Sequence, residues 1–405
     1  MILTRSLTMT LAAALLAAGC GDNDNSKGDS SGNPTPIPTA TPATVTAQAV
    51  VANYADLLYA NYGDALAGAE ALHEAVEAFL DAPSQATFDA AKAAWIASRP
   101  AYQQSEIGRF YNGPIDDPDT GPEGRINSWP LDENFIDYVE GAPESGLIND
   151  PVGFPVIDED TIAAANQASG ETDVSTGYHA IEFLLWGQDR STTGPGERPF
   201  TDYVTDGTGT ASNQARRAQY LETLTHILID DLQHVTDQWA PGSVTNYRAQ
   251  FLAIDTNEAL GRILTGLGSL SAGELGGERL SVAFETRDQE DEHSCFSDTT
   301  RDDLANDALG IQNGYLGRYG TLDGPGIDEL VRQVDPTLDA TVQAQLAASV
   351  AAVRAIPNPF DQAIIGPDDS PGRVAVETAI TDLFAQGDGL SSVAEALGVS
   401  TGTGE

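Results

Sequence analysis

Residues 177–187 read GYHAIEFLLWG and set a histidine and a glutamate three positions apart inside an apolar run. Residues at positions i and i+3 share one face of a helix, so we predict that His179 and Glu182 lie side by side on a buried helix. An imidazole and a carboxylate among apolar side chains are costly to bury unless each finds a partner or an ion. The stretch therefore predicts a helix with a polar site on one face.

Apolar residues recur at steps of three and four on both sides of this stretch, which is the pattern of amphipathic helices. One helix is expected from about residue 44 to 81, and Ser84 is placed to cap a second one. No run shows the sustained alternation of a strand, and 405 residues suggest about two domains. We predict an all-α fold of two helical bundles with long irregular loops, the first over 44–205 and the second over 206–400. A long helix at the start of each half suggests a duplicated bundle.

The chain is strongly acidic, with 61 Asp and Glu against 19 Lys and Arg and a formal net charge of -42. Binding of nucleic acid needs clustered Lys and Arg for the phosphates, so we expect no nucleic-acid partner. A surplus of carboxylates favours solubility in a salty medium or a surface that attracts cations. Composition alone does not choose between these two interpretations.

The start of the chain has the composition of an export signal followed by a tether. An arginine precedes an apolar run over 7–18, which is too short to span a membrane as a mature helix. Residues 16–20 resemble a bacterial lipoprotein signal, which implies a lipid on Cys20, and the glycine that follows favours outer-membrane sorting. We expect a signal peptide over 1–20 and a flexible tether over 21–43. The protein would then be exported and lipid-anchored to the outer membrane, facing the periplasm or the cell surface.

Two further blocks mix polar and aromatic residues in a way that a plain core does not require. The expected second helix carries four of them on roughly one face, namely Trp95, Arg99, Tyr102 and Glu106. The two aromatic residues fit core positions, whereas Arg99 is a natural counter-charge for carboxylates and can also bind an anionic ligand bidentately. The later block covers residues 289–298 and includes Glu290, His293, Ser294 and Asp298.

Together the three blocks resemble the imelysin-like family of exported bacterial proteins, also described as iron-regulated protein A-like. The resemblance rests on residues 95–106 ahead of Gly-Pro-Ile at 113–115, on the G-x-H-x-x-E block at 177–187 and on 289–298. It covers the chain from about residue 45. The resemblance implies two helical-bundle domains with the G-x-H-x-x-E residues near their interface. It also implies a role in iron acquisition or periplasmic and outer-membrane metal handling, with iron-uptake partners, and some members have been called metallopeptidases.

A divalent metal site is the first chemistry that these residues suggest, with iron or zinc as the metal. His179 and Glu182 can supply two ligands. Glu106 or His293 can complete the site, and Glu290 is a further candidate for the third ligand. The H-E-x-x-H motif of zinc peptidases does not occur in the chain. A zinc peptidase would also need about three protein ligands.

We weigh three functions. The first is an exported lipoprotein of iron acquisition that binds a metal ion or a small ligand in a cleft between the bundles. The second is a zinc metallopeptidase that uses His179 and Glu182, and the third is a scaffold whose polar cluster only locks the bundles together. The binding role is preferred over the peptidase, and its expected ligand-binding residues are Trp95, Arg99, Tyr102, Glu290, Ser294 and Asp298.

Overall fold

The computed structural model describes residues 44–191 and 193–402. The structure is 65% helix and 2% strand, so the predicted all-α class is confirmed. The strands β1 (Arg318–Tyr319) and β2 (Leu322–Asp323) form a short antiparallel hairpin. The expected signal peptide, tether and lipidated Cys20 lie outside the described residues.

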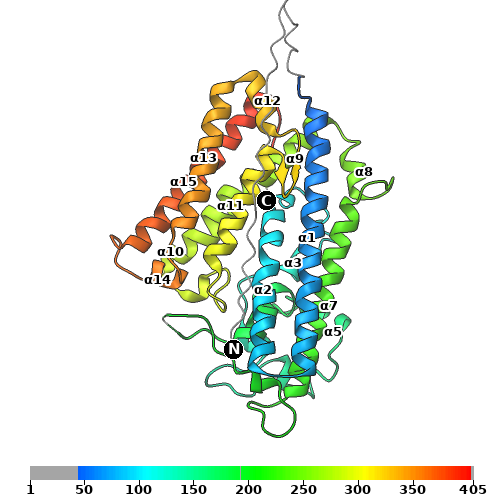
Figure 1. Ribbon diagram of the computed structural model, residues 1–405, viewed down its shortest axis with the longest axis vertical. Coiled ribbons are helices and arrows are strands. Elements are labelled where there is room, and N and C mark those ends of the chain that lie inside the picture. Colours follow the sequence, from blue (N-terminus) through cyan, green and yellow to red (C-terminus); the bar gives the residue numbers. More distant parts are fainter. Residues whose placement is uncertain (1–43, 192, 403–405) are drawn as a thin grey trace, which may run out of the picture. The chain divides into compact units, whose positions relative to one another are not determined.

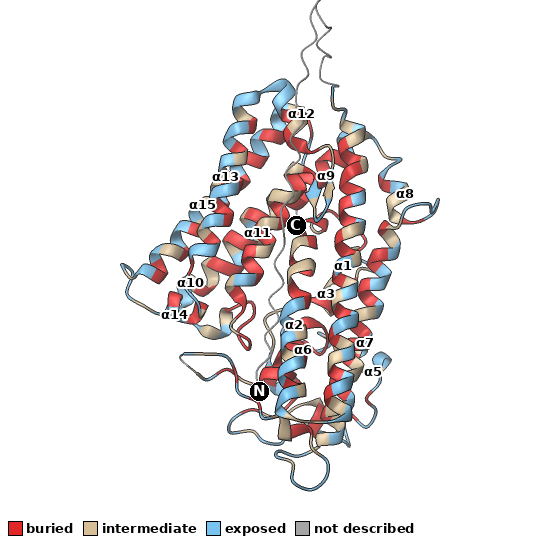
Figure 2. Ribbon diagram, in the orientation of Figure 1, coloured by how far each residue is buried: buried red, intermediate tan, exposed pale blue. Residues whose placement is uncertain are grey.

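Helices α1 (Ala47–Asp81), α2 (Gln85–Ser105) and α7 (Gln214–Trp239) form one group, in which α1 packs against both others and α6 (Gly177–Trp186) packs against α2 and α7 (Figure 1). Ser84 begins α2 through a capping box, as the sequence predicts. The predicted apolar face of α1 is buried (Figure 2), and it includes Leu58, Ala65, Ala69, Leu72, Val76 and Phe79.

The other long helices form a second group. Helix α9 (Thr256–Gly268) continues into the π-helical segment η4 (Ser269–Ser281). Helices α11 (Thr300–Leu316) and α15 (Pro371–Leu397) pack against η4, and α13 (Pro336–Ala355) packs against both of them (Figure 1).

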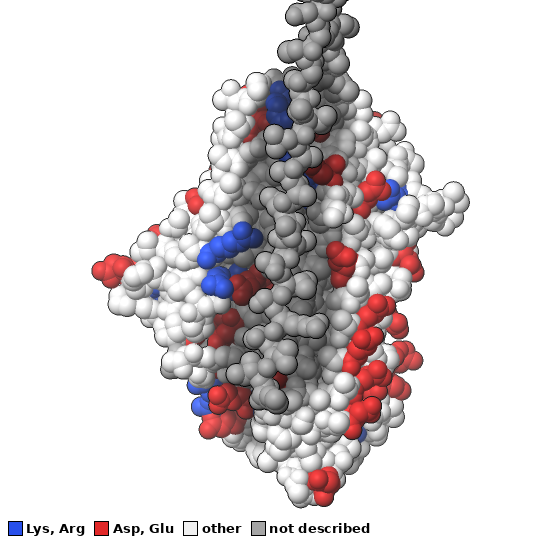
Figure 3. Space-filling model, viewed as in Figure 1, with Lys and Arg blue, Asp and Glu red and all other residues white. Residues whose placement is uncertain are grey.

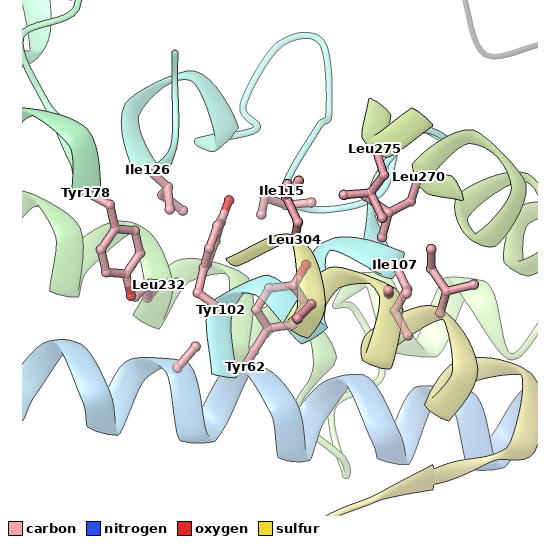
Figure 4. Packing of buried hydrophobic residues seen from close by; sticks show 14 of the residues in the cluster. Tyr62, Tyr102, Ile107, Ile115, Ile126, Tyr178, Leu232, Leu270, Leu275 and Leu304 are labelled. Carbon is pink, nitrogen blue, oxygen red and sulfur yellow. The ribbon is translucent and has the colours of Figure 1, made fainter. Parts of the chain in front are cut away.

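The two groups meet where α11 packs against α2 and where α9 packs against α1. Figure 4 shows Tyr102 of α2 and Leu304 of α11 in one apolar cluster with Leu275 of η4. Val45–Glu405 is one compact unit. The domain boundary predicted between residues 205 and 206 stays a prediction. Helix α7 follows that boundary in the sequence, and it packs against α1, which precedes the boundary.

Short elements connect the long helices. The short elements are η1 (Glu106–Gly108), α3 (Glu123–Ile126), α4 (Glu133–Ile136), η2 (Leu147–Asn149), α5 (Glu159–Ala165), η3 (Phe200–Tyr203), α8 (Tyr247–Phe251), α10 (Val282–Thr286), η5 (Gln289–Asp291), α12 (Ile327–Val334) and α14 (Phe360–Ile364). Within the described ranges, no helix combines the length and the apolar character needed to cross a membrane.

The π-helical geometry of η4 decides which of its side chains meet. Backbone hydrogen bonds in a π-helix join residues five apart, whereas residues five apart in an α-helix point about 140° away from each other. In η4, Nε of Arg279 donates to Oε1 of Glu274 at 3.0 Å. The hydroxyl of Ser281 donates to the carbonyl of Gly276 with the same spacing. The segment therefore holds Arg279 in a fixed direction.

Acidic side chains are prominent on the surface, in line with the net charge. On the face drawn in Figure 3, Asp and Glu gather along the side formed by α1 and α7. Carboxylates also occur in the interior, where their neutralisation depends on their neighbours.

Candidate functional site

Helix α6 brings the G-x-H-x-x-E residues into the interior. Every residue of α6 is buried, as the apolar run predicts. Gly177 begins the helix with a φ of 85°, a left-handed value that favours glycine, and a Cβ there would clash with the carbonyl oxygen of Ile126. Gly187 follows the last turn with a φ of 72°. The two glycines therefore fix where the helix starts and stops against its neighbours.

His179 and Glu182 form the side-chain pair that their spacing predicts. Nδ1 of His179 lies 3.0 Å from Oε2 of Glu182. Oε1 of Glu182 accepts hydrogen bonds from the backbone N–H and the hydroxyl of Ser297 at 2.9 and 2.6 Å. Burial raises the pKa of Glu182 to about 8, against the opposing effect of Ser297. Both oxygens of Glu182 are thus engaged by protein groups, and the carboxyl orients the imidazole of His179.

The other ring nitrogen of His179, Nε2, is buried and has no hydrogen-bond partner among the described residues. When Glu182 is ionised, Nδ1 carries the hydrogen of the shared bond and Nε2 keeps a free lone pair. When Glu182 is protonated, its O–H donates to Nδ1 and the ring hydrogen sits on Nε2. Nε2 is therefore an acceptor or metal ligand in the first state and a donor in the second.

His293 places a second imidazole beside the first. The ring centroids of His179 and His293 are 4.7 Å apart, and the ring planes meet at 78°. Nε2 of His293 lies 3.4 Å from the side-chain nitrogen Nδ2 of Asn127. Nδ1 of His293 lies 3.4 Å from Oδ2 of Asp303 but makes no hydrogen bond to it. Burial, followed by the charge of Arg279, lowers the pKa of His293 to about 3. Burial also lowers the pKa of His179, so both rings are neutral near neutral pH.

Arg99 reaches the same place from α2. Its Nε and Nη2 donate to Oδ2 of Asp303 on α11 at 3.1 and 2.7 Å, and its Nη1 donates to the amide oxygen of Asn127 at 2.8 Å. The hydroxyl of Ser294 donates to the same oxygen of Asp303 at 2.7 Å. Burial alone would raise the pKa of Asp303, but the Arg99 guanidinium outweighs burial and holds that pKa well below its usual range. Asp303 is therefore an ionised partner of Arg99.

A second arginine extends these contacts through Glu106. Nδ2 of Asn127 donates to Oε1 of Glu106 at 2.9 Å, and Nη2 of Arg279 donates to Oε2 at 2.6 Å. Nη1 of Arg279 also donates to Asp307 at 2.9 Å. Nη1 of Arg109 lies 3.6 Å from Glu106. Glu106 is therefore an ion-pair partner of arginine in this arrangement rather than a free metal ligand.

These contacts make one polar network that joins the three blocks singled out in the sequence. The polar network consists of Arg99, Glu106, Asn127, His179, Glu182, Arg279, His293, Ser294, Ser297, Asp303 and Asp307. It contains all four residues predicted to bind metal, as well as Arg99 and Ser294 from the predicted ligand-binding set.

The two aromatic residues of the predicted site border the polar network. The Trp95 ring centroid lies 5.3 Å from the Arg99 guanidinium, and Nε1 of Trp95 donates to the carbonyl of Tyr178 at 2.9 Å. Tyr102 packs against Tyr178 with ring centroids 5.2 Å apart. The hydroxyl of Tyr102 is buried and has no hydrogen-bond partner in the described part of the chain. Both residues are part of the core, and Trp95 also supports Arg99.

Glu290 and Asp298, predicted as ligand-binding residues, lie among other carboxylates. Burial and then the charge of Glu133 raise the pKa of Glu290 to about 7. Burial and then the charge of Asp189 raise the pKa of Asp298 to about 7. Among the described residues, neither side chain hydrogen-bonds to the polar network. The structure thus separates these two carboxylates from His293, although all three come from one block.

Sequence reasoning did not assign roles to Asn127, Arg279, Ser297 and Asp303. Asp303 and Asp307 are four residues apart on α11, and this spacing could have indicated a polar stripe on a buried helix. Arg279 gave no such signal, because its contact with Glu106 depends on the π-helical segment.

The family model described as Peptidase_M75: Imelysin matches residues 58–390. The chain belongs to the imelysin family. Over 357 residues it is 26% identical to the iron-regulated protein A of Synechococcus elongatus, across 86% of this chain and 85% of that protein.

The imelysin fold is also seen in two similar crystal structures. A protein from Parabacteroides distasonis, described as an iron-regulated protein A precursor, gives a TM-score of 0.68 with 21% identity over 89% of this chain and 97% of that one. An imelysin-like protein from Psychrobacter arcticum gives a TM-score of 0.60 with 13% identity over 88% of this chain and 98% of that one. At these identities the likeness shows the fold alone.

The peptidase name of the imelysin family implies a metal, and the residues can be tested against that expectation. Among the side chains of residues 44–191 and 193–402, no group of three or more His, Cys, Asp or Glu could hold a metal ion. Glu106 is engaged by Arg279, and both oxygens of Glu182 accept or share hydrogen bonds. A zinc peptidase needs about three protein ligands and a water. The residues of this imelysin do not fit such a site, and no hydrolytic step follows from them.

A surface pocket of this imelysin reaches the outer end of the polar network. It has a volume of 1020 Å³, and residues of η4, α15 and the segment after η1 line it. Two of its lining residues, Arg109 and Glu274, are partly exposed. Nη1 of Arg109 lies 3.6 Å from Glu106, and Glu274 accepts a hydrogen bond from Arg279. The pocket therefore gives solvent access to side chains that contact the network.

Proposed function

We propose that this imelysin is a binding protein of iron acquisition that holds a metal ion or a small polar ligand at His179 and His293. The iron-regulated protein A of Synechococcus elongatus supports the link to iron by its name. The polar network supports a binding role, because satisfying so many buried charges demands a dedicated arrangement that helix packing alone does not require.

The observation that carries this proposal is the buried, unpartnered Nε2 of His179. Metal-binding histidines almost always donate their other ring N–H to a carboxylate, a carbonyl or a water, which fixes the tautomer and the orientation of the ring. Glu182 lies in that position, 3.0 Å from Nδ1 of His179. Because burial favours the protonated form of Glu182 near neutral pH, metal binding at Nε2 would release that proton and leave an ionised Glu182 as the acceptor of the Nδ1–H. The neighbouring ring of His293 offers a second imidazole. Two imidazoles suit iron or zinc, and the remaining ligands would come from water or from the bound molecule.

One observation favours a purely structural network as the second candidate. The guanidinium groups of Arg99 and Arg279 are already paired with Asp303, Glu106 and Asp307. A structural network predicts that Glu182→Gln lowers the melting temperature without changing the affinity for any ligand. The binding proposal predicts that Glu182→Gln weakens metal binding as well, because glutamine cannot accept the imidazole hydrogen as a charged group.

Titration of metal-free protein with iron(II) under anaerobic conditions, and separately with zinc(II), tests the proposal. The experiment is best done in His226→Gln protein, because His73 and His226 form a second imidazole pair with ring centroids 4.3 Å apart on α1 and α7. We expect one metal ion per chain and at least about tenfold weaker binding when His179→Ala is added. Identical affinity with and without His179 would overturn the proposal. A peptidase assay on the same proteins shows whether any cleavage depends on His179.

We also propose that the protein is exported, is lipid-anchored to the outer membrane through Cys20 and works with iron-uptake partners rather than nucleic acid. The support is the lipoprotein-like sequence at 16–20 and the charge of -42. Labelling of cells with a radioactive fatty acid should mark the wild-type protein and leave Cys20→Ala unmarked. Equal labelling of both proteins would exclude Cys20 as the lipid attachment site.

A further inference from the structure

The surface pocket beside the polar network has one wall in an unusual backbone conformation. We call this pocket, which is lined by η4, α15 and the segment 109–116, the η4 pocket. Phe110 and Asn112 both line it and have φ values of 70° and 54°, which are uncommon for residues other than glycine. The backbone N–H groups of Phe110 and Gly113 donate to the carboxylate of Asp116. Backbone strain of this kind persists only where surrounding contacts impose it, and it clusters at functional sites.

Arg109 is held at the η4 pocket by a close approach of two backbones. A Cβ at Gly266 of α9 would clash with the carbonyl oxygen of Ile107, so glycine lets α9 pack directly on the segment that carries Arg109. Nε of Arg109 is buried and has no hydrogen-bond partner among the described residues. Arg109 therefore brings to the pocket an N–H donor that the protein does not use.

The charges at the η4 pocket are largely matched by protein groups. The Arg109 guanidinium lies 3.1 Å from Glu123 and 3.6 Å from Glu106, and it is 3.9 Å from Glu274. Glu274 also accepts a hydrogen bond from Nε of Arg279 at 3.0 Å. Burial alone would raise the pKa of Glu274, but Arg279 and then Arg109 outweigh burial and lower it. Arg109 and Glu274 therefore need no charged ligand to neutralise them.

The hydrogen-bonding capacity of the η4 pocket is not used up in the same way. Each oxygen of a carboxylate can accept two hydrogen bonds. In the described part of the chain, Asp116 accepts one from Phe110 and one from Gly113, and Glu274 accepts only at Oε1. Glu278, which also lines the pocket, is exposed, so water and salt screen its charge. The pocket thus offers a donor and several acceptors whose charges are already compensated or screened.

We propose that the η4 pocket binds a neutral, hydroxyl-rich small molecule of the sugar class. A hydroxyl group both donates and accepts hydrogen bonds, so the hydroxyls of one ligand can meet the carboxylates and also the Arg109 guanidinium. An anionic ligand would face Asp116, Glu274 and Glu278 with like charge, and a cationic one would face Arg109. The volume of 1020 Å³ is ample for a mono- or disaccharide, because pockets of about 300–1,000 Å³ hold organic ligands of drug size.

Saturation-transfer NMR of the full chain, followed by calorimetric titration, tests this ligand class. The neutral probes are glucose and maltose. Glucosamine and glucuronate carry a positive and a negative charge on the same ring as glucose. We expect glucose and maltose to bind, glucuronate to bind at least about tenfold more weakly than glucose, and glucosamine to bind no more tightly than glucose.

Gly273→Leu fills the η4 pocket without a clash. An added Cβ at Gly273 meets nothing within 4 Å, and glycine is the costlier residue in a helix interior. The variant should melt no lower than the wild type and should lose sugar binding. Gly63→Leu on α1, outside the pocket, also has open space at the added Cβ and should bind sugar as the wild type does.

Arg109→Lys keeps the positive charge but removes the Nε donor. We expect it to bind glucose about tenfold more weakly, because one hydrogen bond from a charged group is lost. This variant decides the question if Gly273→Leu does not fold.

Absence of saturation transfer to both glucose and maltose would overturn the proposal. Tenfold tighter binding of glucosamine or glucuronate than of glucose would overturn the neutral class, and undiminished binding by folded Gly273→Leu would overturn the location. The sugar site does not rest on the proposed function. Sugar binding by chelator-treated protein that takes up no iron or zinc would leave the site standing and remove only the proposed function.

Discussion

The polar network and a group of four carboxylates, Asp189, Glu292, Asp298 and Asp361, which we call the acidic cluster, differ in how their charge is neutralised. In the polar network, Arg99 meets Asp303 and Arg279 meets Glu106 at hydrogen-bonding distance. In the acidic cluster, Glu292 is as inaccessible as Glu106, yet no arginine or lysine among the described residues forms an ion pair with it. The two regions share the loop at 287–299. This one segment of chain therefore carries residues of the arginine-paired polar network and also carboxylates that have no arginine partner among the described residues.

The difference teaches that burial alone does not set the state of a carboxylate. Arg99 holds the pKa of Asp303 well below its usual range despite burial, whereas burial and the nearby Asp361 raise the pKa of Glu292 well above its usual range. A carboxylate paired with arginine is a structural partner. A buried carboxylate without an arginine partner needs a proton or an external cation. Substitutions in the two regions can test this difference between paired and unpaired carboxylates.

Arg99→Met should produce the largest effect, because it leaves the buried carboxylate of Asp303 without its guanidinium. We expect the free energy of unfolding to fall by about 3–5 kcal/mol in chemical denaturation. Arg318→Met is the matched control. Arg318 pairs with Asp323 on the hairpin, where its side chain is 57% exposed, and the loss there should stay below about 1 kcal/mol. Equal losses would refute the neutralising role of Arg99.

The two regions should respond to pH with opposite sign. The depressed pKa of Asp303 contributes stability that is present above about pH 4 and is lost as the pH falls below it. Burial raises the pKa values of Asp189, Glu292 and Asp298, so the folded chain keeps protons that the unfolded chain has released, and stability falls as the pH rises. For Asp298 and Asp189 the pKa values rise from 3.8 to about 7 and about 6.

This pH response can be isolated by comparing the wild type with the double variant Asp189→Asn and Asp298→Asn in chelator. Between about pH 4 and pH 7 the wild type should lose about 2 kcal/mol relative to the double variant, after allowance for solvent screening. Urea denaturation across this range measures the difference. A constant difference would show that the two carboxyl groups titrate normally.

The smallest expected effect concerns two serine hydroxyls, one bonded to an ionised carboxylate and one bonded to a protonated carboxyl group. Ser294 donates to the ionised Asp303, whereas Ser297 donates to Glu182, whose pKa of about 8 keeps it protonated near neutral pH. Hydrogen bonds to charged groups are the stronger ones. We expect Ser294→Ala to cost about 2 kcal/mol and Ser297→Ala about 1 kcal/mol of unfolding free energy at neutral pH. The reverse order would indicate that Glu182 is ionised in the folded protein.

Local features of this structure follow from the sequence because they depend on neighbours along the chain. The three- and four-residue steps through Leu58 and Leu72 predict the buried face of α1, and Ser84 predicts the start of α2. The spacing of His179 and Glu182 predicts their contact for the same reason. These predictions need only the geometry of one helix.

Long-range partners could not be predicted in this way. Asp303 lies 204 positions after Arg99, so their contact depends on the packing of α11 against α2. Arg279 meets Glu274 because η4 is π-helical, and α-helical periodicity would turn the two apart. The block at 289–298 has no helical period, so its sequence could not tell that Asp298, unlike His293, makes no hydrogen bond to the polar network.

Anomalous scattering at the iron absorption edge, from crystals grown with iron(II), tests the central claim that Nε2 of His179 is a ligand atom. We predict a peak about 2.1 Å from Nε2 of His179, which is an ordinary metal–nitrogen distance. The peak should lie beside the ring of His293, and Glu182 should still accept the hydrogen bond from Nδ1 of His179. A map without that peak, in which an ordered water occupies the hydrogen-bonding position of Nε2, would contradict the account.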